Sequence, residues 1–344
     1  MPISDGTPVV LAAFDKFRGT LTAQAACAAA AEAARAVGVA AITCPLADGG
    51  EGTLDAVGGD AVFTTVTGPD HTPVVAEWRV LDAGSRAPTA VIEMAQASGL
   101  VVAGGAARND PVAATTRGVG ELVLAAVAAG CRRVVIGCGG SATTDGGAGA
   151  LEVLTPGHLH DVDLLVACDV NTSFLDAARV FGPQKGAGPE AVNELTTRLA
   201  HLADHYRDQY GVDVATLARA GAAGGLAGGL AALGGSLIAG FDLIAAIVGF
   251  PAALGQSDLV VTGEGHLDAT SLDGKVVGEV AARADGRVPV VVIAGDAEPG
   301  VLAERSDCTV VSLTERFGTD AATSSTAALI ARVVREQLRS VGWS

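Results

Sequence analysis

Positive charge is scarce in this sequence. Its 344 residues include 22 Lys and Arg against 38 Asp and Glu, a formal net charge of −16, and the basic residues form no run. A protein that binds duplex nucleic acid needs a Lys- and Arg-rich face to replace condensed counterions. Anionic membrane surfaces likewise attract polybasic segments. We therefore expect neither nucleic acid nor a membrane as a partner.

Closely spaced cysteines are absent too. The six cysteines have no CxxC spacing, and several lie in or beside apolar runs. This pattern is typical of small core residues in a reducing compartment. The opening residues, MPISDGTPVV, show no basic segment followed by an apolar core, so we expect no signal peptide. Both observations predict a cytoplasmic protein.

A transmembrane segment is not expected either. Residues 220–241 carry no charge, are long enough to span a bilayer and contain GxxxG spacings. However, the stretch is rich in glycine and poor in large apolar side chains, which gives it little insertion energy. We predict a closely packed soluble helix with its loops here.

Glycine, by contrast, is in excess. The 46 glycines make up about 13% of the chain against a usual ~7%. Glycine costs backbone entropy and is typical of places where something approaches the backbone closely. The excess therefore has to be explained by particular segments.

Short β-branched runs alternate with alanine-rich stretches, which predicts an α/β fold. The length favours two domains. Between Gly58 and Glu93, three strand-like runs follow one another without a helix, which indicates an antiparallel or mixed segment. We predict a discontinuous, doubly wound Rossmann-like domain over 1–60 and 250–344. A second α/β domain, 61–249, is inserted into it.

Four glycine-rich segments follow strand-like runs and carry acidic or hydroxyl side chains. Open α/β sheets bind ligands at the carboxyl ends of their strands, so we expect these segments to act as loops around one crevice. They are Asp15–Thr20 (DKFRGT), Leu46–Gly52 (LADGGEG), Gly137–Gly147 (GCGGSATTDGG) and Thr262–Asp268 (TGEGHLD).

The two central segments suggest anion binding. In LADGGEG, glycine amides can face an anion. Asp48 and Glu51 fit beside a phosphate only if a metal or a substrate hydroxyl lies between them. The alternative is a tight turn with two solvated acids. GCGGSATTDGG contains a loose GxGxxA dinucleotide fingerprint, but its hydroxyls and Asp145 fit an anion cradle with a metal-facing carboxylate better.

The two outer segments carry charges of both signs. Glu264 and Asp268 could hold a cation or sugar-like hydroxyls, whereas His266 is more readily explained as a solvated or core residue. Lys16 and Arg18 precede a predicted helix and could attract phosphate or carboxylate. A plain solvated loop is the alternative for these two cations. Lys275 lies a few residues after the Thr262–Asp268 segment, at the start of a predicted helix. The alternative to a functional role for Lys275 is a surface role.

Several catalytic motifs are missing. The chain has no GxxxxGK[ST], HExxH or GxSxG sequence and no Cys/His metal cluster. The residues alone therefore indicate an α/β enzyme that handles a nucleotide or phosphate, with Mg²⁺ held by carboxylates. They do not name the substrate.

The order of several motifs resembles that of the bacterial type I glycerate kinases over nearly the whole chain. The segments are DKFRGTLTA, PLADGGEGT, GGSATTDGGAGALE, FGPQKGA and TGEGHLDATSLDGK. The resemblance implies the two-domain fold of that family and transfer of the γ-phosphoryl group of ATP to D-glycerate, giving 2-phosphoglycerate. It also implies ATP and Mg²⁺ as cofactors, and a homodimer is one candidate assembly.

Three alternatives stay open at this point. The first is a kinase for another small hydroxy acid, and the second is a non-catalytic metabolite-binding protein on the same scaffold. The third, a dinucleotide-dependent oxidoreductase, rests on the GxGxxA coincidence alone.

The resemblance and the needs of phosphoryl transfer together assign roles to residues. Asp48 and Glu51 are expected at the glycerate hydroxyls, with Asp48 as the favoured base. Arg18 and Lys185 are expected to neutralise the substrate carboxylate or the transferring phosphoryl group. The remaining assignments are cofactor binding by Gly139, Gly140, Ser141, Thr143, Gly146, Gly147, Glu264 and Lys275, and metal binding by Asp145 and Asp169.

The chain also departs from the family pattern. His266 stands where Arg is usual, Thr144 where Asn is usual, and Asp273 where His is common. The connector between Leu154 and Leu164 is much shorter than usual, and the loop after Asn171 is shortened too. Because an unperturbed His is mostly neutral at pH 7, we expect weaker anion binding at His266 and a shifted choice of hydroxy acid.

Overall fold

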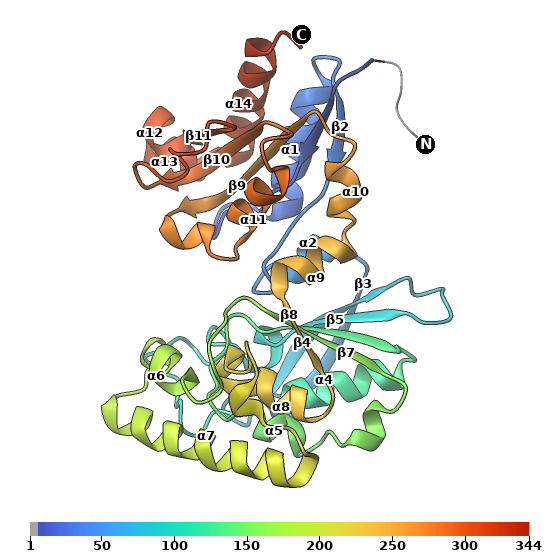
Figure 1. Cartoon of the computed structure of the whole chain (residues 1–344), viewed down its shortest axis with the longest axis vertical. Helices are drawn as coiled ribbons and strands as arrows, with labels where there is room; N and C mark the ends of the chain where they lie inside the picture. Colours follow the sequence, from blue (N-terminus) through green and yellow to red (C-terminus); the bar gives the residue numbers. More distant parts are fainter. Residues whose placement is uncertain (1–5, 344) are drawn as a thin grey trace. The chain divides into compact units, whose positions relative to one another are not determined.

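The computed structural model describes residues 6–343 and divides them into two compact units (Figure 1). Unit 1 comprises residues 6–48, 55–57 and 241–343, and unit 2 comprises 49–54 and 58–240. Both units contain a β-sheet with helices, which confirms the α/β class. Their limits differ from the predicted 60 and 250, because Phe241, Ile244 and Ala245 pack into the hydrophobic clusters of unit 1.

Unit 1 contains a five-stranded parallel sheet with the strand order β11-β10-β9-β1-β2. The strands are β1 (Val9–Ala12), β2 (Ala40–Thr43), β9 (Leu259–Leu267), β10 (Val290–Ala297) and β11 (Cys308–Ser312). Its helices are α1 (Ala23–Arg35), α9 (Gly240–Ile247), α10 (Phe250–Leu254), α11 (Val276–Ala284), α12 (Leu313–Phe317), α13 (Thr319–Ser324) and α14 (Thr326–Ser340), with a 3-10 turn at Ala269–Leu272.

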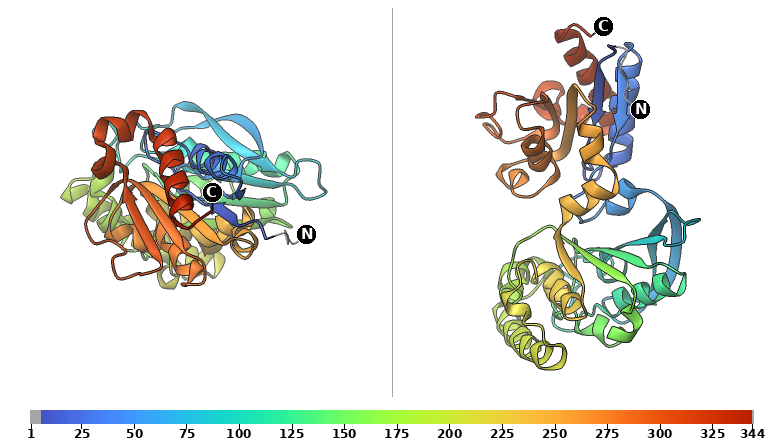
Figure 2. Two further views of the ribbon diagram at one scale, coloured as in Figure 1. Left: turned by 90° about the horizontal axis from the view of Figure 1, so that it is seen from above. Right: turned by 45° about the vertical axis from the view of Figure 1, so that its right-hand side comes forward.

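Alternate residues of β1 show that both faces of this sheet are covered. Val10 and Ala12 pack with α1 and α14, which lie side by side (Figures 1 and 2). Leu11 and Ala13 pack instead in a second cluster that includes α11. The side chains of a strand alternate between faces, so helices lie on both faces of the parallel sheet. This is the doubly wound arrangement predicted from the sequence.

The glycine-rich segment Thr262–Asp268 lies almost entirely in a strand, so its prediction as a loop was wrong. Strand β9 continues through the TGEG sequence to Leu267, and His266 pairs with Asp296 of β10. Glycine fits here because of the neighbouring backbone. A Cβ atom on Gly263 would lie 1.8 Å from the carbonyl oxygen of Ile293. These glycines therefore allow strands β9 and β10 to approach each other.

Unit 2 contains a six-stranded mixed sheet with the order β3-β4-β5-β6-β7-β8. The first three strands are β3 (Asp60–Thr67), β4 (Pro73–Leu81) and β5 (Thr89–Glu93), and they pair antiparallel, as predicted. Strands β6 (Arg133–Gly137), β7 (Asp163–Cys168) and β8 (Ser236–Ala239) continue the sheet in parallel with β5.

Helices of this unit contact both the antiparallel and the parallel strands of the sheet. They are α3 (Ala95–Ser98), α4 (Arg117–Ala128), α5 (Ala148–Leu151), α6 (Ala177–Phe181), α7 (Pro189–Tyr210) and α8 (Leu226–Ala232), with 3-10 turns at Pro156–Leu159, Pro183–Lys185, Val214–Thr216 and Ala222–Gly225; α2 (Thr53–Val57) spans the boundary between the units. The helical spacing of apolar residues predicts a helix over Pro189–Tyr210, and the long helix α7 has these bounds. Pro189 occupies its first turn, and Gly211 ends it in a left-handed conformation.

The uncharged stretch 220–241 forms the short buried helix α8 followed by strand β8, which the sequence did not predict. None of the described helices is both long and apolar enough to cross a bilayer. The glycines of residues 220–241 pack closely against the backbone of other segments. A Cβ atom on Gly225 would lie 2.8 Å from the Cα atom of Gly146, and Gly225 has a φ of +92°. Part of the glycine excess therefore allows this stretch to pack against the GGSATTDGG loop.

The shortened connector leads into β7 at its first residue, Asp163, which pairs with the first residue of β6. It therefore lies at the amino ends of these parallel strands. Residues that follow the strands, such as Gly139 and Asp169, lie at the opposite, carboxyl edge. The short connector is therefore remote from the strand ends at which these predicted site residues lie.

Candidate active site

Each unit gathers polar side chains at the carboxyl ends of its parallel strands. In unit 1 the segments that begin at Asp15, end at Asp48 and contain Glu264 follow or extend neighbouring strands. In unit 2 the segments 49–52 and 137–147 lie together. A Cβ atom on Gly139 would be 2.4 Å from the Cα atom of Gly50.

The group in unit 1 centres on Asp15 and Glu264. Beyond the end of β1, the backbone N–H of Asp15 donates to the carbonyl oxygen of Gly263, at 3.0 Å. The register of β1 and β9, in which Ala12 pairs with Val261, therefore brings Asp15 beside Glu264. Both residues are only 9% exposed. Two buried acidic residues thus lie beside each other, one just beyond the end of β1 and the other in β9.

Burial sets the ionisation of these two carboxyl groups. It raises the pKa of Asp15 to about 7; Lys16 opposes this shift, whereas Asp48 and Glu264 add to it. Burial also raises the pKa of Glu264, against a hydrogen bond from Ser271 and the charge of Lys275. The Oε1 atom of Glu264 is buried, and among the described residues it has no hydrogen-bond partner. A buried acceptor of this kind is costly to the fold unless something binds it.

The predicted residues of unit 1 surround this pair. Asp48 is half-buried, and its charge acts on both Asp15 and Glu264. Lys275 precedes α11, and its Nζ donates to the hydroxyl of Thr270 at 2.8 Å. Arg18 is exposed, and its backbone N would lie 3.1 Å from a Cβ atom on Gly265. The structure thus brings the predicted residues of this unit to one edge of its sheet.

Asp15 is a functional candidate that the sequence analysis missed. The signal available was its place directly after the apolar run VVLAAF, which predicts a buried strand with Asp15 near its carboxyl end. What the sequence could not show was the burial of Asp15 beside Glu264, which lies far away along the chain.

Unit 2 contains a pocket of about 220 Å³. Its polar lining combines Ser141, Asp169, Gln184 and Lys185, and the rest of the lining comes from Leu100, Cys138, Gly139, Gly140, Val170, Phe181 and Ala223. Glycine, hydroxyl, acidic and basic groups therefore face one space. The resemblance had already suggested a role for Gly139, Gly140, Ser141, Asp169 and Lys185.

Lys185 is a buried cation in an acidic protein. It is 2% exposed, and its Nζ donates to the carbonyl oxygen of Thr143 at 2.7 Å. Burial lowers its pKa to about 7, while the charges of Asp145 and Asp169 oppose the shift. Burial disfavours the charged form of this amine, and a bound anion would stabilise that form.

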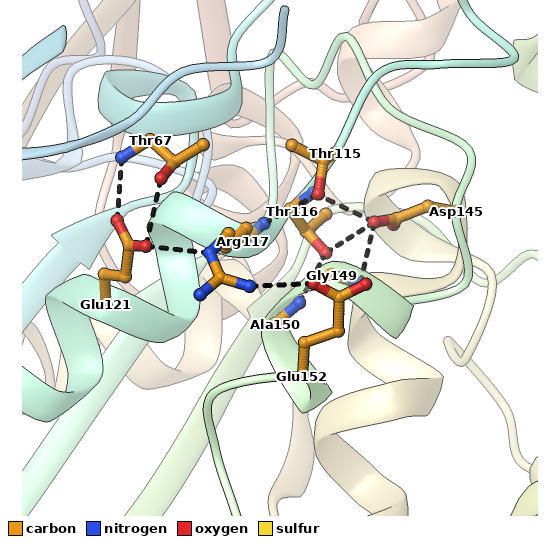
Figure 3. A network of polar contacts seen from close by, with 9 residues as sticks. All are labelled: Thr67, Thr115, Thr116, Arg117, Glu121, Asp145, Gly149, Ala150 and Glu152. Carbon is orange, nitrogen blue, oxygen red and sulfur yellow. Dashed lines mark hydrogen bonds and ion pairs between the residues drawn. The ribbon is translucent and has the colours of Figure 1, made fainter. Parts of the chain in front are cut away.

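Asp145 lies in the network drawn in Figure 3. Its Oδ2 accepts hydrogen bonds from the backbone N and the hydroxyl of Thr116 and from the N of Gly149, at 2.8–3.1 Å, and its Oδ1 accepts one from the N of Gly147 at 3.0 Å. The hydroxyl of Thr116 in turn accepts a bond from the N of Ala150. Asp145 thereby ties the GGSATTDGG loop to the start of α4. These bonds favour an anchoring role for this carboxylate over the predicted role as a metal ligand.

The other predicted residues of unit 2 have varied surroundings. Thr143 is fully buried, and its hydroxyl oxygen has no hydrogen-bond partner among the described residues. Gly146 and Gly147 have positive φ angles and pack against Leu202 and Gly229. Glu51 is exposed, and its backbone N lies 3.5 Å from the Cβ position of Gly139. Gly146 and Gly147 therefore shape the loop, whereas Glu51 is accessible beside it.

A magnesium ion at this site would have few protein ligands. The described residues contain no group of three or more His, Cys, Asp and Glu side chains placed to hold a metal. Mg²⁺ is commonly held by one or two carboxylates together with substrate phosphates and water. Asp169, which lines the pocket beside Ser141 and Lys185, fits this type of binding.

Comparison with known proteins agrees with this geometry. The model of the glycerate kinase family matches residues 10–156 and 154–341. The chain belongs to the glycerate kinase family. The two matched segments meet at 154–156, where the shortened connector begins. Membership makes the chain a kinase, and the resemblance noted from the sequence is confirmed.

Relatives in bacteria support the same family assignment. The chain is 35% identical to the glycerate 2-kinase of Escherichia coli over 81% of this chain and 82% of that protein. It is 39% identical to the glycerate kinase of Bacillus subtilis over 73% of this chain and 75% of that protein. A solved structure assigned as glycerate kinase 2 of Salmonella typhimurium LT2 matches 97% of this chain and 99% of that one, with 30% identity and a TM-score of 0.80.

Proposed function

We propose that this member of the glycerate kinase family transfers the γ-phosphoryl group of ATP to D-glycerate and forms 2-phosphoglycerate. The observation that carries the proposal is the pocket of unit 2, where the buried Lys185 lies with Ser141 and Asp169. A protein of net charge −16 needs a placed cation to hold anionic phosphates. The names of the relatives in Escherichia coli and Bacillus subtilis support glycerate as the acceptor.

In unit 2, Gly139, Gly140 and Ser141 would bind phosphate oxygens through amide and hydroxyl groups. Lys185 would neutralise charge on the transferring group, and Asp169 would hold Mg²⁺. The ion supplies charge neutralisation on the phosphates during transfer. Asp145 would act one step away from the ligand, by fixing the loop that carries Ser141 and the Thr143 carbonyl.

In unit 1, Asp48 would bind a glycerate hydroxyl, and Arg18 the glycerate carboxylate, since an Arg guanidinium matches a carboxylate in two hydrogen bonds. Glu51, which follows three residues later and belongs to unit 2, would bind the second hydroxyl. Glu264 and Lys275 would complete the binding of the nucleotide. A carboxylate must also accept the hydroxyl proton, and the sequence favours Asp48 for this task.

A cytoplasmic location is part of the proposal. All six cysteines are free thiols, and five of them are buried, which suits a reducing compartment.

The expected homodimer stays a prediction, and light scattering of the purified chain would test it.

The test of the function is an assay of the purified chain with MgATP and D-glycerate, with ADP release measured. Enolase added without a phosphoglycerate mutase consumes 2-phosphoglycerate but not 3-phosphoglycerate, so its coupled signal identifies the product. ADP release with another hydroxy acid but not with glycerate would support the alternative kinase. Binding by calorimetry without any ADP release would support a non-catalytic protein.

A further inference from the structure

Asp15 has no part in the roles assigned above, yet it occupies the position where an open α/β sheet binds its ligand. From β1 the chain passes to β2 on one side, whereas β9, β10 and β11 lie on the other side. The strand order therefore reverses between β1 and β9. Ligands of such sheets bind at the carboxyl ends of the strands at this reversal. Asp15 follows β1 there, and Glu264 lies beside it in β9.

The carboxylate of Asp15 is held in place from the backbone. Its Oδ1 accepts a hydrogen bond from the N–H of Lys16 at 2.7 Å, which orients the group and leaves Oδ2 outside that bond. The residue is 9% exposed. On the adjacent strand, Glu264 directs a buried oxygen, Oε1, that no described residue satisfies. An unsatisfied buried acceptor lowers the stability of the fold. Beside an oriented carboxylate, the same acceptor can bind the hydroxyl group of a ligand.

The charges around Asp15 suit proton transfer. Burial raises its pKa to about 7, the carboxylates of Asp48 and Glu264 add to the shift, and Lys16 opposes it. A general base works best when its pKa lies near the working pH, because it must be deprotonated and still accept a proton. The groups that set this balance come from the β1 loop, the segment after β2, and β9.

We propose that Asp15, rather than Asp48, is the catalytic residue that accepts the proton of the glycerate hydroxyl. This proposal rests on the proposed function. The hydroxyl oxygen forms a bond to the γ-phosphorus of ATP, and the bond between that phosphorus and the β,γ-bridging oxygen breaks with its electron pair staying on ADP. The hydroxyl proton passes to the carboxylate of Asp15. Asp48 then binds substrate without taking the proton.

The experiment compares D15N with D48N in the full chain, using MgATP and D-glycerate. For D15N we expect kcat to fall about a hundredfold or more, while the Kd of glycerate measured by calorimetry changes far less. For D48N we expect the larger change in KM. The matched control is D285N. Asp285 is exposed at the end of α11 in a left-handed conformation that Asn also adopts, and this variant should keep wild-type kinetics.

A pH profile separates proton transfer from a structural role. In E264Q, removal of a neighbouring negative charge lowers the pKa of Asp15, so the acid limb of kcat/KM should move to lower pH. D15E should keep an acid limb with a reduced kcat. Both variants carry the test if D15N fails to fold, which circular dichroism and thermal unfolding will show.

Each contrary result identifies what is wrong. A D15N enzyme with kcat within about threefold of wild type, or an acid limb that E264Q leaves unmoved, would overturn the role of Asp15. A loss of kcat in D48N but not in D15N would return the role to Asp48. A wild-type chain that releases no ADP with D-glycerate would instead overturn the proposed function, and the role of Asp15 with it.

Discussion

Gly224 packs directly against Thr143. A Cβ atom on Gly224 would lie 2.0 Å from the carbonyl oxygen of Thr143, and Gly224 has a φ of +67°. The same carbonyl oxygen accepts the hydrogen bond from Nζ of Lys185. One close backbone contact therefore helps to fix the partner of the buried cation. Gly224 therefore does not line the pocket, but its lack of a side chain allows the Thr143 carbonyl to lie where Lys185 binds it.

Replacing Gly224 with alanine should displace that carbonyl. We expect G224A to lose about 2 kcal/mol or more of unfolding free energy, from overpacking and from the strained φ, and to lower kcat as the Lys185 partner moves. Urea unfolding and the coupled assay measure these effects. The control is G234A. Gly234 also has a positive φ, +95°, but nothing lies within 4 Å of its Cβ position. Equal losses in the two variants would show that the contact with Thr143 contributes nothing.

The hydroxyl of Thr116 should contribute measurably to stability. It donates to Asp145 at 2.8 Å and accepts from the N of Ala150 at 3.1 Å, and Thr116 is fully buried. T116V keeps the side-chain shape but removes one of the three hydrogen bonds to Oδ2 of Asp145 and the hydrogen bond from the N of Ala150. The free energy of unfolding should therefore fall by about 1–3 kcal/mol. T197V on the exposed side of α7 is the control and should change it by less than about 0.5 kcal/mol. Thermal and urea unfolding of the two variants test this. A T116V protein as stable as T197V would contradict the anchoring role of Asp145.

The sequence predicted the elements that local signals define. The sequence predicts a helix over Val276–Ala284, and α11 has these bounds. Helix α7, with a proline at one end and a glycine at the other, also has its predicted bounds. Strand β8 was missed, because SLIA lies in a stretch whose glycines suggested helix and loop. The TGEG sequence suggested a loop, because glycine pairs are typical of turns. In β9 those glycines instead allow close pairing with β10.

The sequence predicts those candidate site residues whose polar side chains lie within the recognised motifs. Lys185, Ser141 and Asp169 do line one pocket. The sequence predicted Asp145 as a metal ligand but could not show its hydrogen bonds from Thr116, which lies 29 residues earlier in the chain. The burial of Asp15 depends on pairing with β9, at the other end of the sequence. Long-range contacts of this kind leave no local pattern.

The stability of the protein should depend on pH through Lys185. Burial lowers the pKa of this lysine from 10.5 to about 7. Between these two values the unfolded chain binds a proton that the folded chain does not, so the free energy of unfolding should rise with pH from about 7 to about 10. Below pH 7 both states hold the proton, and the full cost of the buried charge remains.

K185M should remove this dependence. Urea unfolding at pH 6.5, 8 and 9.5 should show wild type gaining stability relative to K185M as the pH rises. K275M retains Lys185 and should keep the wild-type slope. A wild-type chain and a K185M variant with parallel pH profiles would contradict the lowered pKa of Lys185.

Restoring the residue usual in the family at position 266 should strengthen substrate binding. Nδ1 of His266 lies 3.7 Å from Oδ2 of Asp296, and both side chains are about half exposed. Arg carries a permanent charge, whereas an unperturbed His is mostly neutral above pH 7. H266R should therefore lower the KM for glycerate about two- to fivefold at pH 8, the effect of one exposed charge. H205R, on the exposed face of α7, should leave KM unchanged. A KM that rises in H266R, or that falls equally in H205R, would show that position 266 has no specific role in binding the substrate.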